Sequence, residues 1–203
     1  MGGFYCSRRD SMKSMKSINS ERSVRICYGW IKRLSKVRFL VQAAIVAALY
    51  TVLTVFFAPL SFGGQQFRVS EALTVLPAVI PGAIPGLFLG CVLSNSFSFM
   101  GLPDMIFGSV ATLTSAILTF YLARALKDRS MILRLALIPL PPVTVNALII
   151  GAMLHYIVGL PFPVAALGVL TGQVAACYFV GCPIYLFVEN FEKSKGIRLF
   201  YNK

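Results

Sequence analysis

The sequence predicts an all-α integral membrane protein, built as an S-component-type bundle of six transmembrane helices. Apolar residues make up 57% of its 203 residues and charged residues only 13%, about half of the roughly 25% usual for a soluble domain. The mean hydropathy is +0.77. Residues 39–58 contain no charged side chain, and a run of about 20 apolar residues can cross a bilayer core of about 30 Å. This composition excludes an ordinary soluble domain.

Six apolar segments follow one another along the chain, and we expect each of them to cross the lipid bilayer. They cover residues 39–58, 70–80, 83–99, 105–125, 135–158 and 164–188. The second segment is short. Pro77, Pro81 and Pro85 therefore leave a choice at this point between two spans and one long broken span.

The basic residues favour six spans over five. Cytoplasmic loops are enriched in Lys and Arg. Six spans with a cytoplasmic N-terminus place three basic groups on that side: ten residues up to Arg38, four from Arg124 to Arg134, and four from Lys193 onward. Five spans would move the last two groups outside. We therefore expect both termini in the cytoplasm, with Arg68 as the only basic residue on the outer face.

The same patterns suggest three regions. Residues 1–37 form a basic, serine-rich leader that we expect to be largely disordered. Residues 38–190 form the six-helix transmembrane domain, and residues 191–203 form a basic cytoplasmic tail. The net charge of +12 comes from residues that flank apolar segments. It therefore reflects membrane orientation, and we expect no binding to nucleic acid.

No catalytic or metal-binding pattern is present in the sequence. The five cysteines form no CxxC pair, and three of them lie in apolar segments, where they are expected to pack as small hydrophobic residues. A single histidine excludes HExxH, and neither GxSxG nor a P-loop pattern occurs. We expect a protein that is not an enzyme and that has no metal or cofactor. ATP-driven work would have to come from another subunit.

A few polar residues lie within or at the ends of the apolar segments. Ionisable groups at membrane depth are costly, and they are candidates for functional sites. Most of the polar residues in this sequence that lie at membrane depth gather in the outer half of the predicted bundle. The candidates are Glu71 and Asp104 at the outer starts of two spans, Asn95 and His155 near the outer ends of two others, and Asn146 and Gln173 nearer the middle.

Each candidate also has a purely structural interpretation. Ser70 could cap a helix in which Glu71 lies near the positive end of the dipole, with Arg68 as a surface partner. Asp104 follows Pro103 and could open its helix in the same way. A lone histidine near an interface is often structural, and buried amides can bridge helices. Only the clustering of these residues at one face favours a binding site.

Small residues at four-residue spacing indicate close approach between helices. Such ladders occur at Gly82/Gly86/Gly90, at Gly108/Thr112/Ala116 and at Gly168/Gly172/Ala176, where internal packing is expected. In the first span, Ala43/Ala47 and Ala44/Ala48 start directly after the cytoplasmic end. This stripe fits either internal packing or the docking of a partner protein.

Five ordered blocks closely resemble the QueT family: QFRVSEALTVLP, PGAIPGLFLGCVLSN, DMIFGSVATL, PPVTVNALIIG and GQVAACYFVGCPIY. The resemblance runs from about Arg38 to Glu189. Members are described as queuosine-precursor transporters, the substrate-binding S components of energy-coupling factor (ECF) importers. The resemblance implies a multi-pass protein of the bacterial cell membrane with an outward-facing pocket. It also implies a membrane T component and two cytoplasmic ATPases as partners, with Ala43, Ala44, Ala47 and Ala48 contacting the T component.

The implied ligand is a 7-deazaguanine such as preQ1 or preQ0. Its N1–H and N2–H₂ groups are adjacent donors, and a carboxylate accepts two such donors in parallel. Glu71 is the first candidate for this edge. Arg68 would orient Glu71 or close a loop over the ligand, and Asp104 would, with Glu71, favour the cationic aminomethyl precursor over the neutral nitrile.

Other residues complete the expected site. Asn95, Asn146 and Gln173 would satisfy O6 and the ring nitrogens, His155 lies at the same outer face, and Phe67 or Tyr178 would stack on the base. Gln173 stands where the family pattern leads us to expect a glutamate, which removes a charge. The alternative reading of the chain is a stand-alone secondary transporter or channel subunit for a small polar solute.

Overall fold

A computed structural model describes residues 36–58, 68–98 and 100–195. The chain forms two units, Met1–Arg38 and Phe39–Lys203, and nearly all of the described residues belong to the second. Phe67, almost all of the expected leader and the end of the expected tail lie outside the described residues.

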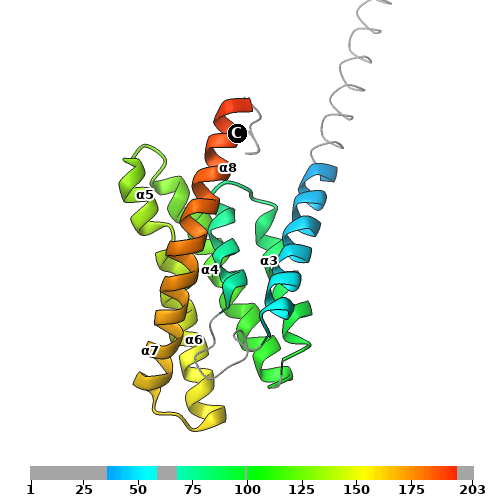
Figure 1. The fold of residues 1–203 in the computed structure, drawn as a ribbon, viewed down its shortest axis with the longest axis vertical. Helices are drawn as coiled ribbons and strands as arrows, with labels where there is room; N and C mark the ends of the chain where they lie inside the picture. Colours follow the sequence, from blue (N-terminus) through cyan, green and yellow to red (C-terminus); the bar gives the residue numbers. More distant parts are fainter. Residues whose placement is uncertain (1–35, 59–67, 99, 196–203) are drawn as a thin grey trace, which may run out of the picture. The chain divides into compact units, whose positions relative to one another are not determined.

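The regular structure of the described residues is entirely helical (Figure 1). The first helix is Lys36–Phe56. It is followed by the 3₁₀-helix η1 (Val69–Ala78), α3 (Ala83–Asn95), α4 (Leu102–Ala125), α5 (Met131–Leu137), α6 (Leu140–Val158), α7 (Phe162–Val174), the π-helix η2 (Ala175–Gly181) and α8 (Cys182–Lys195). The predicted all-α class is confirmed.

Four of the six predicted spans are long and apolar enough to cross a bilayer: Lys36–Phe56, Leu102–Ala125, Met131–Val158 and Phe162–Phe191. The other two, η1 and α3, are shorter apolar helices of 10 and 13 residues. Rises of about 2.0 Å per residue in a 3₁₀-helix and about 1.5 Å in an α-helix give each a length of about 20 Å. That is less than a bilayer core of about 30 Å.

The short helix η1 is enclosed by the rest of the bundle. All of its residues from Ser70 to Ala78 are buried, so it does not have to match the thickness of the lipid. A 3₁₀ run of ten residues is unusually long. Pro77 lies inside it and lacks the backbone N–H that an α-helix would use.

The helix Lys36–Phe56 and α3 are parallel neighbours. Three glycines lie against successive turns of that helix in the same order along both segments: Gly82 at Phe39, Gly86 at Ala43 and Gly90 at Ala47. A side-chain carbon on Gly86 would lie 2.6 Å from the carbonyl oxygen of Ala43, so this approach needs glycine. The chain therefore returns between the two helices, and η1 runs in the opposite direction to both.

The remaining helices continue this alternation. Asp104 at the start of α4 lies beside Arg68 at the start of η1. At the other end of the bundle, a buried cluster joins the end of η1, the end of α4, the residue after α5, and α8 through Val79, Ala123, Ile138 and Tyr185. We refer to these as the Arg68 end and the α5 end of the bundle.

Two of the predicted spans are interrupted. The fifth divides into α5 and α6 at Ile138–Pro139, and Pro141 then occupies the first turn of α6, where a missing N–H costs nothing. The sixth contains η2, seven residues of π-helix between α7 and α8. Gly181 at the end of η2 packs on η1, since a side-chain carbon there would lie 3.0 Å from the carbonyl oxygen of Ala72.

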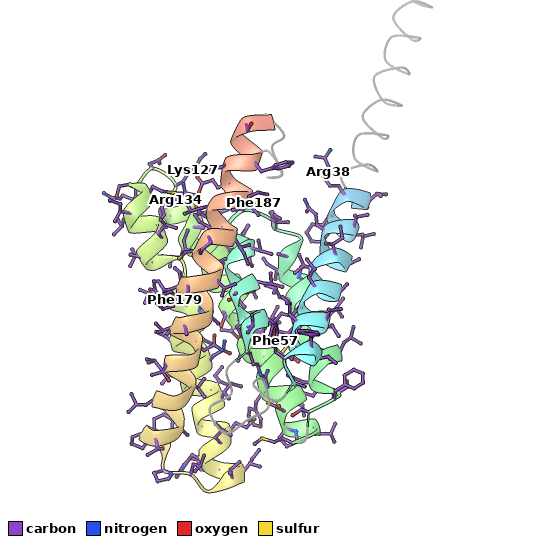
Figure 2. The ribbon with its side chains drawn as sticks, in the orientation of Figure 1. Arg38, Phe57, Lys127, Arg134, Phe179 and Phe187 are labelled. Atoms are coloured by element: carbon purple, nitrogen blue, oxygen red, sulfur yellow. The ribbon has the colours of Figure 1, made fainter. Side chains whose placement is uncertain are left out.

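The outer surface of the last helical segment is apolar, as expected for a face in contact with lipid. Phe179 and Phe187, labelled in Figure 2, are 79% and 71% exposed. Lys127 and Arg134 lie at the α5 end in the same view. This separation of apolar sides from a basic end is what the charge pattern of the sequence predicts.

Candidate functional site

Glu71 is a buried carboxylate surrounded by hydrogen-bond donors from other helices. Its side chain is 1% exposed. Oε1 accepts hydrogen bonds from the Tyr50 hydroxyl at 2.5 Å and from the Thr112 hydroxyl at 3.2 Å. Oε2 accepts a hydrogen bond from Nδ2 of Asn146 at 3.2 Å. Glu71 thus joins η1 to the helix Lys36–Phe56, to α4 and to α6.

The first turn of η1 sets the position of Glu71. The N-cap residue of η1 is Arg68, and no side chain caps the helix. The backbone N–H of Glu71 donates to the carbonyl oxygen of Arg68 at 3.1 Å. The hydroxyl of Ser70 accepts a hydrogen bond from Thr54 at 2.7 Å. The alternative interpretation of Ser70 as a helix cap is therefore wrong, because this hydroxyl bonds to another helix.

Arg68 is buried and forms its ion pair with Asp104. Nη2 of Arg68 lies 2.8 Å from Oδ1 of Asp104, and their side chains are 4% and 1% exposed. The hydroxyl of Ser98 donates to Oδ2 of Asp104, and Nδ2 of Asn95 donates to its backbone oxygen at 2.9 Å. The alternative interpretation of Arg68 as a surface residue does not hold, because its side chain is buried and pairs with Asp104.

A chain of polar contacts connects the Arg68–Asp104 pair with Glu71. Nδ2 of Asn95 also lies 3.3 Å from the sulfur of Cys91, and the Thr112 hydroxyl lies 3.4 Å from the same sulfur. Because Thr112 donates to Glu71, the contacts run without a break from Asp104 to Glu71. Oδ1 of Asn95 has no hydrogen-bond partner among the described residues, although the side chain is fully buried.

Gln173 and the backbone of Glu71 both contact Cys177. The Cys177 thiol lies 3.7 Å from Oε1 of Gln173 and 3.6 Å from the backbone oxygen of Glu71. Gln173 is 3% exposed. The structure thus gathers six of the predicted residues, and we call this group the Glu71 network: Arg68, Glu71, Asn95, Asp104, Asn146 and Gln173, with Tyr50, Cys91, Thr112 and Cys177 bridging them.

Two other predicted residues lie apart from the Glu71 network. His155 is exposed near the end of α6, and its Nδ1 lies 2.7 Å from the carbonyl oxygen of Leu160. The Tyr178 hydroxyl donates to the carbonyl oxygen of Ala136 at 2.7 Å, which directs this side chain toward the α5 end. The stacking role expected for Tyr178 stays a prediction.

The alanine stripe of the first helix has two faces. Ala43 and Ala47 are buried, whereas Ala44 and Ala48 are exposed. The buried pair faces α3, since Ala43 and Ala47 lie against Gly86 and Gly90. The exposed pair is free to meet lipid or another protein.

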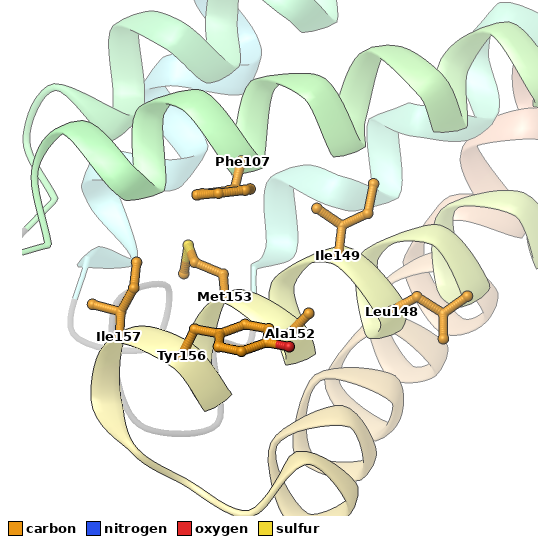
Figure 3. Close-up of a pocket in the computed structure, with 7 residues that line it drawn as sticks. All are labelled: Phe107, Leu148, Ile149, Ala152, Met153, Tyr156 and Ile157. Carbon is orange, nitrogen blue, oxygen red and sulfur yellow. The ribbon is translucent and has the colours of Figure 1, made fainter.

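An apolar pocket of about 520 Å³ lies between α4 and α6. In Figure 3, Phe107 of α4 faces several side chains of α6, which include Met153 and Tyr156. Tyr156 is 84% exposed, so this pocket opens at the surface of the bundle. Its lining contains no residue of the Glu71 network. Within the described part of the chain, no three His, Cys, Asp or Glu side chains lie close enough to hold a metal ion.

Tyr50 and Thr112 were missed as site residues in the sequence. Tyr50 lies in a long apolar run, where a tyrosine is expected to be a packing residue. Thr112 was assigned to a small-residue ladder. A signal was present in the first helix, because Ala43, Ala47, Tyr50 and Thr54 recur at helical spacing and share the buried face.

Comparison with known proteins places the chain in a family. A family model described as QueT transporter matches residues 40–190. The chain belongs to the QueT transporter family. The match spans every residue of the Glu71 network.

A second comparison gives a similar result over a shorter region. An 81-residue stretch is 40% identical to the queuosine precursor transporter QueT of Lactococcus lactis subsp. cremoris (strain MG1363). The alignment covers 39% of this QueT-family chain and 47% of that relative, or about half of its length. No solved structure matches the chain.

Proposed function

We propose that this QueT-family chain is the S component of an ECF importer, and that it captures a queuosine precursor at the Glu71 network. The observation that carries the proposal is the buried Glu71 carboxylate, which is held by donors from three other helices. The name of the Lactococcus lactis relative supplies the ligand class. Family membership supports transport.

The chemistry of the Glu71 network suits the base edge of a 7-deazaguanine. In the structure, Glu71 accepts hydrogen bonds from Thr112 and Asn146. A bound base would replace these donors with its N1–H and N2–H₂ groups in parallel, which is a strong and directional pairing for a carboxylate. Asn146 would then be free to donate to O6 of the base.

Two further groups offer acceptors. Oδ1 of Asn95 is buried without a partner among the described residues, and a ligand N–H would satisfy it. Among the described residues, the donor near Oε1 of Gln173 is the weak thiol of Cys177 at 3.7 Å. A site that presents several acceptors fits a ligand rich in N–H donors. The aminomethyl precursor preQ1 has one more such group than the nitrile precursor preQ0.

The proposed orientation puts the Arg68 end outside and the α5 end in the cytoplasm. The connection from α4 to α5 carries Lys127 and Arg129, and Arg134 lies in α5. Basic loops of this kind favour the cytoplasmic side. Single cysteines labelled from outside intact cells would test this. Labelling is expected at an introduced cysteine after α6, at Gly159, and not at Lys127.

ATP hydrolysis is assigned to partner subunits. The sequence contains no P-loop pattern. The exposed Ala44 and Ala48 provide a face on which the backbone of a T-component helix can approach closely. The S component would bind the ligand alone, and transport would require the T component and two ATPases.

Binding and uptake assays separate this function from a stand-alone carrier. The purified chain is expected to bind preQ1 or preQ0 in calorimetry, whereas cells are expected to take up the ligand only when the ECF module is co-expressed. Uptake by this chain alone, without ATP, would establish a secondary transporter instead. Absence of binding to both precursors would remove the proposed ligand class.

A further inference from the structure

The Arg68–Asp104 ion pair is tightly enclosed by groups of the chain itself. One Asp104 oxygen pairs with Arg68 at 2.8 Å, and the other accepts from Ser98. The pair is also closely packed from the side of α4. A side-chain carbon on Gly108 would lie 2.5 Å from Nδ2 of Asn95 and 3.3 Å from Nη1 of Arg68. A side chain added at Gly108 would therefore have to displace Asn95 and press on Arg68.

The ion pair is connected to Glu71 through a short piece of backbone. The carbonyl oxygen of Arg68 accepts a hydrogen bond from the N–H of Glu71 at 3.1 Å, so the two residues form the first turn of η1. The Arg68 side chain fastens this turn to the start of α4. A movement of the Arg68 backbone away from α4 would therefore also shift Glu71.

We propose that Arg68 and Asp104 are positioning residues, whose buried ion pair holds the first turn of η1 so that the Glu71 carboxylate faces its donors on α4 and α6. Neither side chain contacts the ligand. The proposal deepens the proposed substrate site and rests on it for the binding part of its test. It differs from a ligand-contact role, in which Asp104 would meet the cationic aminomethyl group directly.

Four variants of the full-length chain test this role. Arg68→Met and Asp104→Asn each remove one charge of the pair, and a buried charge left without its partner is strongly unfavourable. Arg68→Lys retains the charge. Ser98→Ala removes one hydrogen bond to Asp104 and is a milder change that keeps the test open if the charge-removing variants do not fold.

A second ion pair supplies the matched control. Nη1 of Arg134 lies 2.8 Å from Oε1 of Glu189, and this pair joins α5 to α8, away from Glu71. Arg134→Met and Glu189→Gln remove an ion pair of the same length at the α5 end. These variants report the general effect of losing a partly buried ion pair.

The first readout needs no ligand. Hydrogen–deuterium exchange of the purified chain measures local opening of backbone hydrogen bonds. We expect Arg68→Met, Asp104→Asn and, to a smaller extent, Ser98→Ala to accelerate exchange in η1 at least about threefold relative to α7. Arg68→Lys is expected to restore slow exchange. The control variants are expected to leave exchange in η1 unchanged.

The second readout compares two ligands of different charge, preQ1 and preQ0. A positioning role predicts that Asp104→Asn weakens the binding of both by a similar factor, about tenfold. Loss of preQ1 binding alone, with exchange in η1 unchanged, would overturn the proposal and assign Asp104 to the ligand. If the unsubstituted chain binds neither precursor, the proposed ligand fails, and the exchange data still decide whether the ion pair holds η1.

Discussion

The Tyr50 hydroxyl donates a hydrogen bond of 2.5 Å to the Glu71 carboxylate, and the tyrosine side chain is completely buried. The two residues are 21 positions apart, on the first helix and on η1. A carboxylate in an apolar bundle is costly unless it is hydrogen-bonded. Tyr50 therefore ties the central acidic group of the site to a helix that also carries the proposed docking face for the T component.

Glu71→Gln is expected to weaken the binding of preQ1 and preQ0 at least tenfold, or about 1.4 kcal/mol. The amide keeps the size of the side chain but replaces one acceptor by a donor, which opposes the N1–H and N2–H₂ edge of the base. Isothermal calorimetry on the purified chain measures the change. Glu189→Gln at the α5 end is the control. Unchanged affinity of Glu71→Gln would leave Glu71 with a structural role only.

Tyr50→Phe is expected to reduce the stability of the chain by about 1.5–3 kcal/mol, because a hydrogen bond to a charged group is lost in a buried place. Thermal unfolding in detergent, followed by circular dichroism or light scattering, measures the change. Tyr121→Phe, at a residue that is 63% exposed on α4, is expected to have little effect. Equal effects of the two variants would argue against a special role for Tyr50.

The sequence predicted the helical class and the four helices that are long enough to cross a bilayer, because long apolar runs are local features. It did not predict that η1 is a 3₁₀-helix or that η2 is a π-helix. Both segments are buried against neighbouring elements, and Gly181 of η2 packs on Ala72 of η1. Such contacts join residues that are far apart in the sequence, so local patterns do not reveal them.

The candidate site was predicted in part of its membership and not in its pairing. Clustering at one face of the bundle correctly grouped Glu71, Asn95 and Asp104, which the structure joins in one network. The partner of Arg68 depended on whether α4 starts beside η1, which the sequence does not show. His155 was placed by depth alone, and depth does not determine the side of a helix on which a residue lies.

Gly108→Ala is expected to weaken ligand binding and to destabilise the chain by about 1–3 kcal/mol, because a buried hydrogen bond is lost. The new side-chain carbon would lie 2.5 Å from Nδ2 of Asn95 and 3.3 Å from Nη1 of Arg68, so the buried amide has to shift. Its displacement would break the bond to the backbone oxygen of Asp104. Gly168→Ala is the matched control, since nothing lies within 4 Å of a side-chain carbon there. Calorimetry and thermal unfolding of both variants test the difference.

Ala47→Leu and Ala48→Leu are expected to have different effects, although the residues are neighbours. Ala47 is buried and its Cα would lie 3.2 Å from a side-chain carbon on Gly90, so a larger residue should destabilise the bundle by about 1–3 kcal/mol. Ala48 is exposed, so its replacement should preserve folding and ligand binding. Ala48→Leu is expected to reduce co-purification with the T component. Val110→Leu, at an exposed position of α4, controls for added bulk.

Gln173→Glu is expected to shift the ligand preference toward the cationic precursor. Gln173 and the backbone of Glu71 both contact Cys177, so a second carboxylate at this position would add negative charge beside the site. An opposite charge on the ligand would be attracted, whereas the neutral nitrile would gain nothing. The ratio of the dissociation constants for preQ0 and preQ1 should rise at least about fivefold, or about 1 kcal/mol. Gln42→Glu is the control. Gln42 lies on the first helix beside Gly82, at the end of α3 opposite Asn95, and its replacement is expected to leave the ratio unchanged. An equal change in both ligands for Gln173→Glu would show that residue 173 acts on the packing of the site and does not select the ligand by charge.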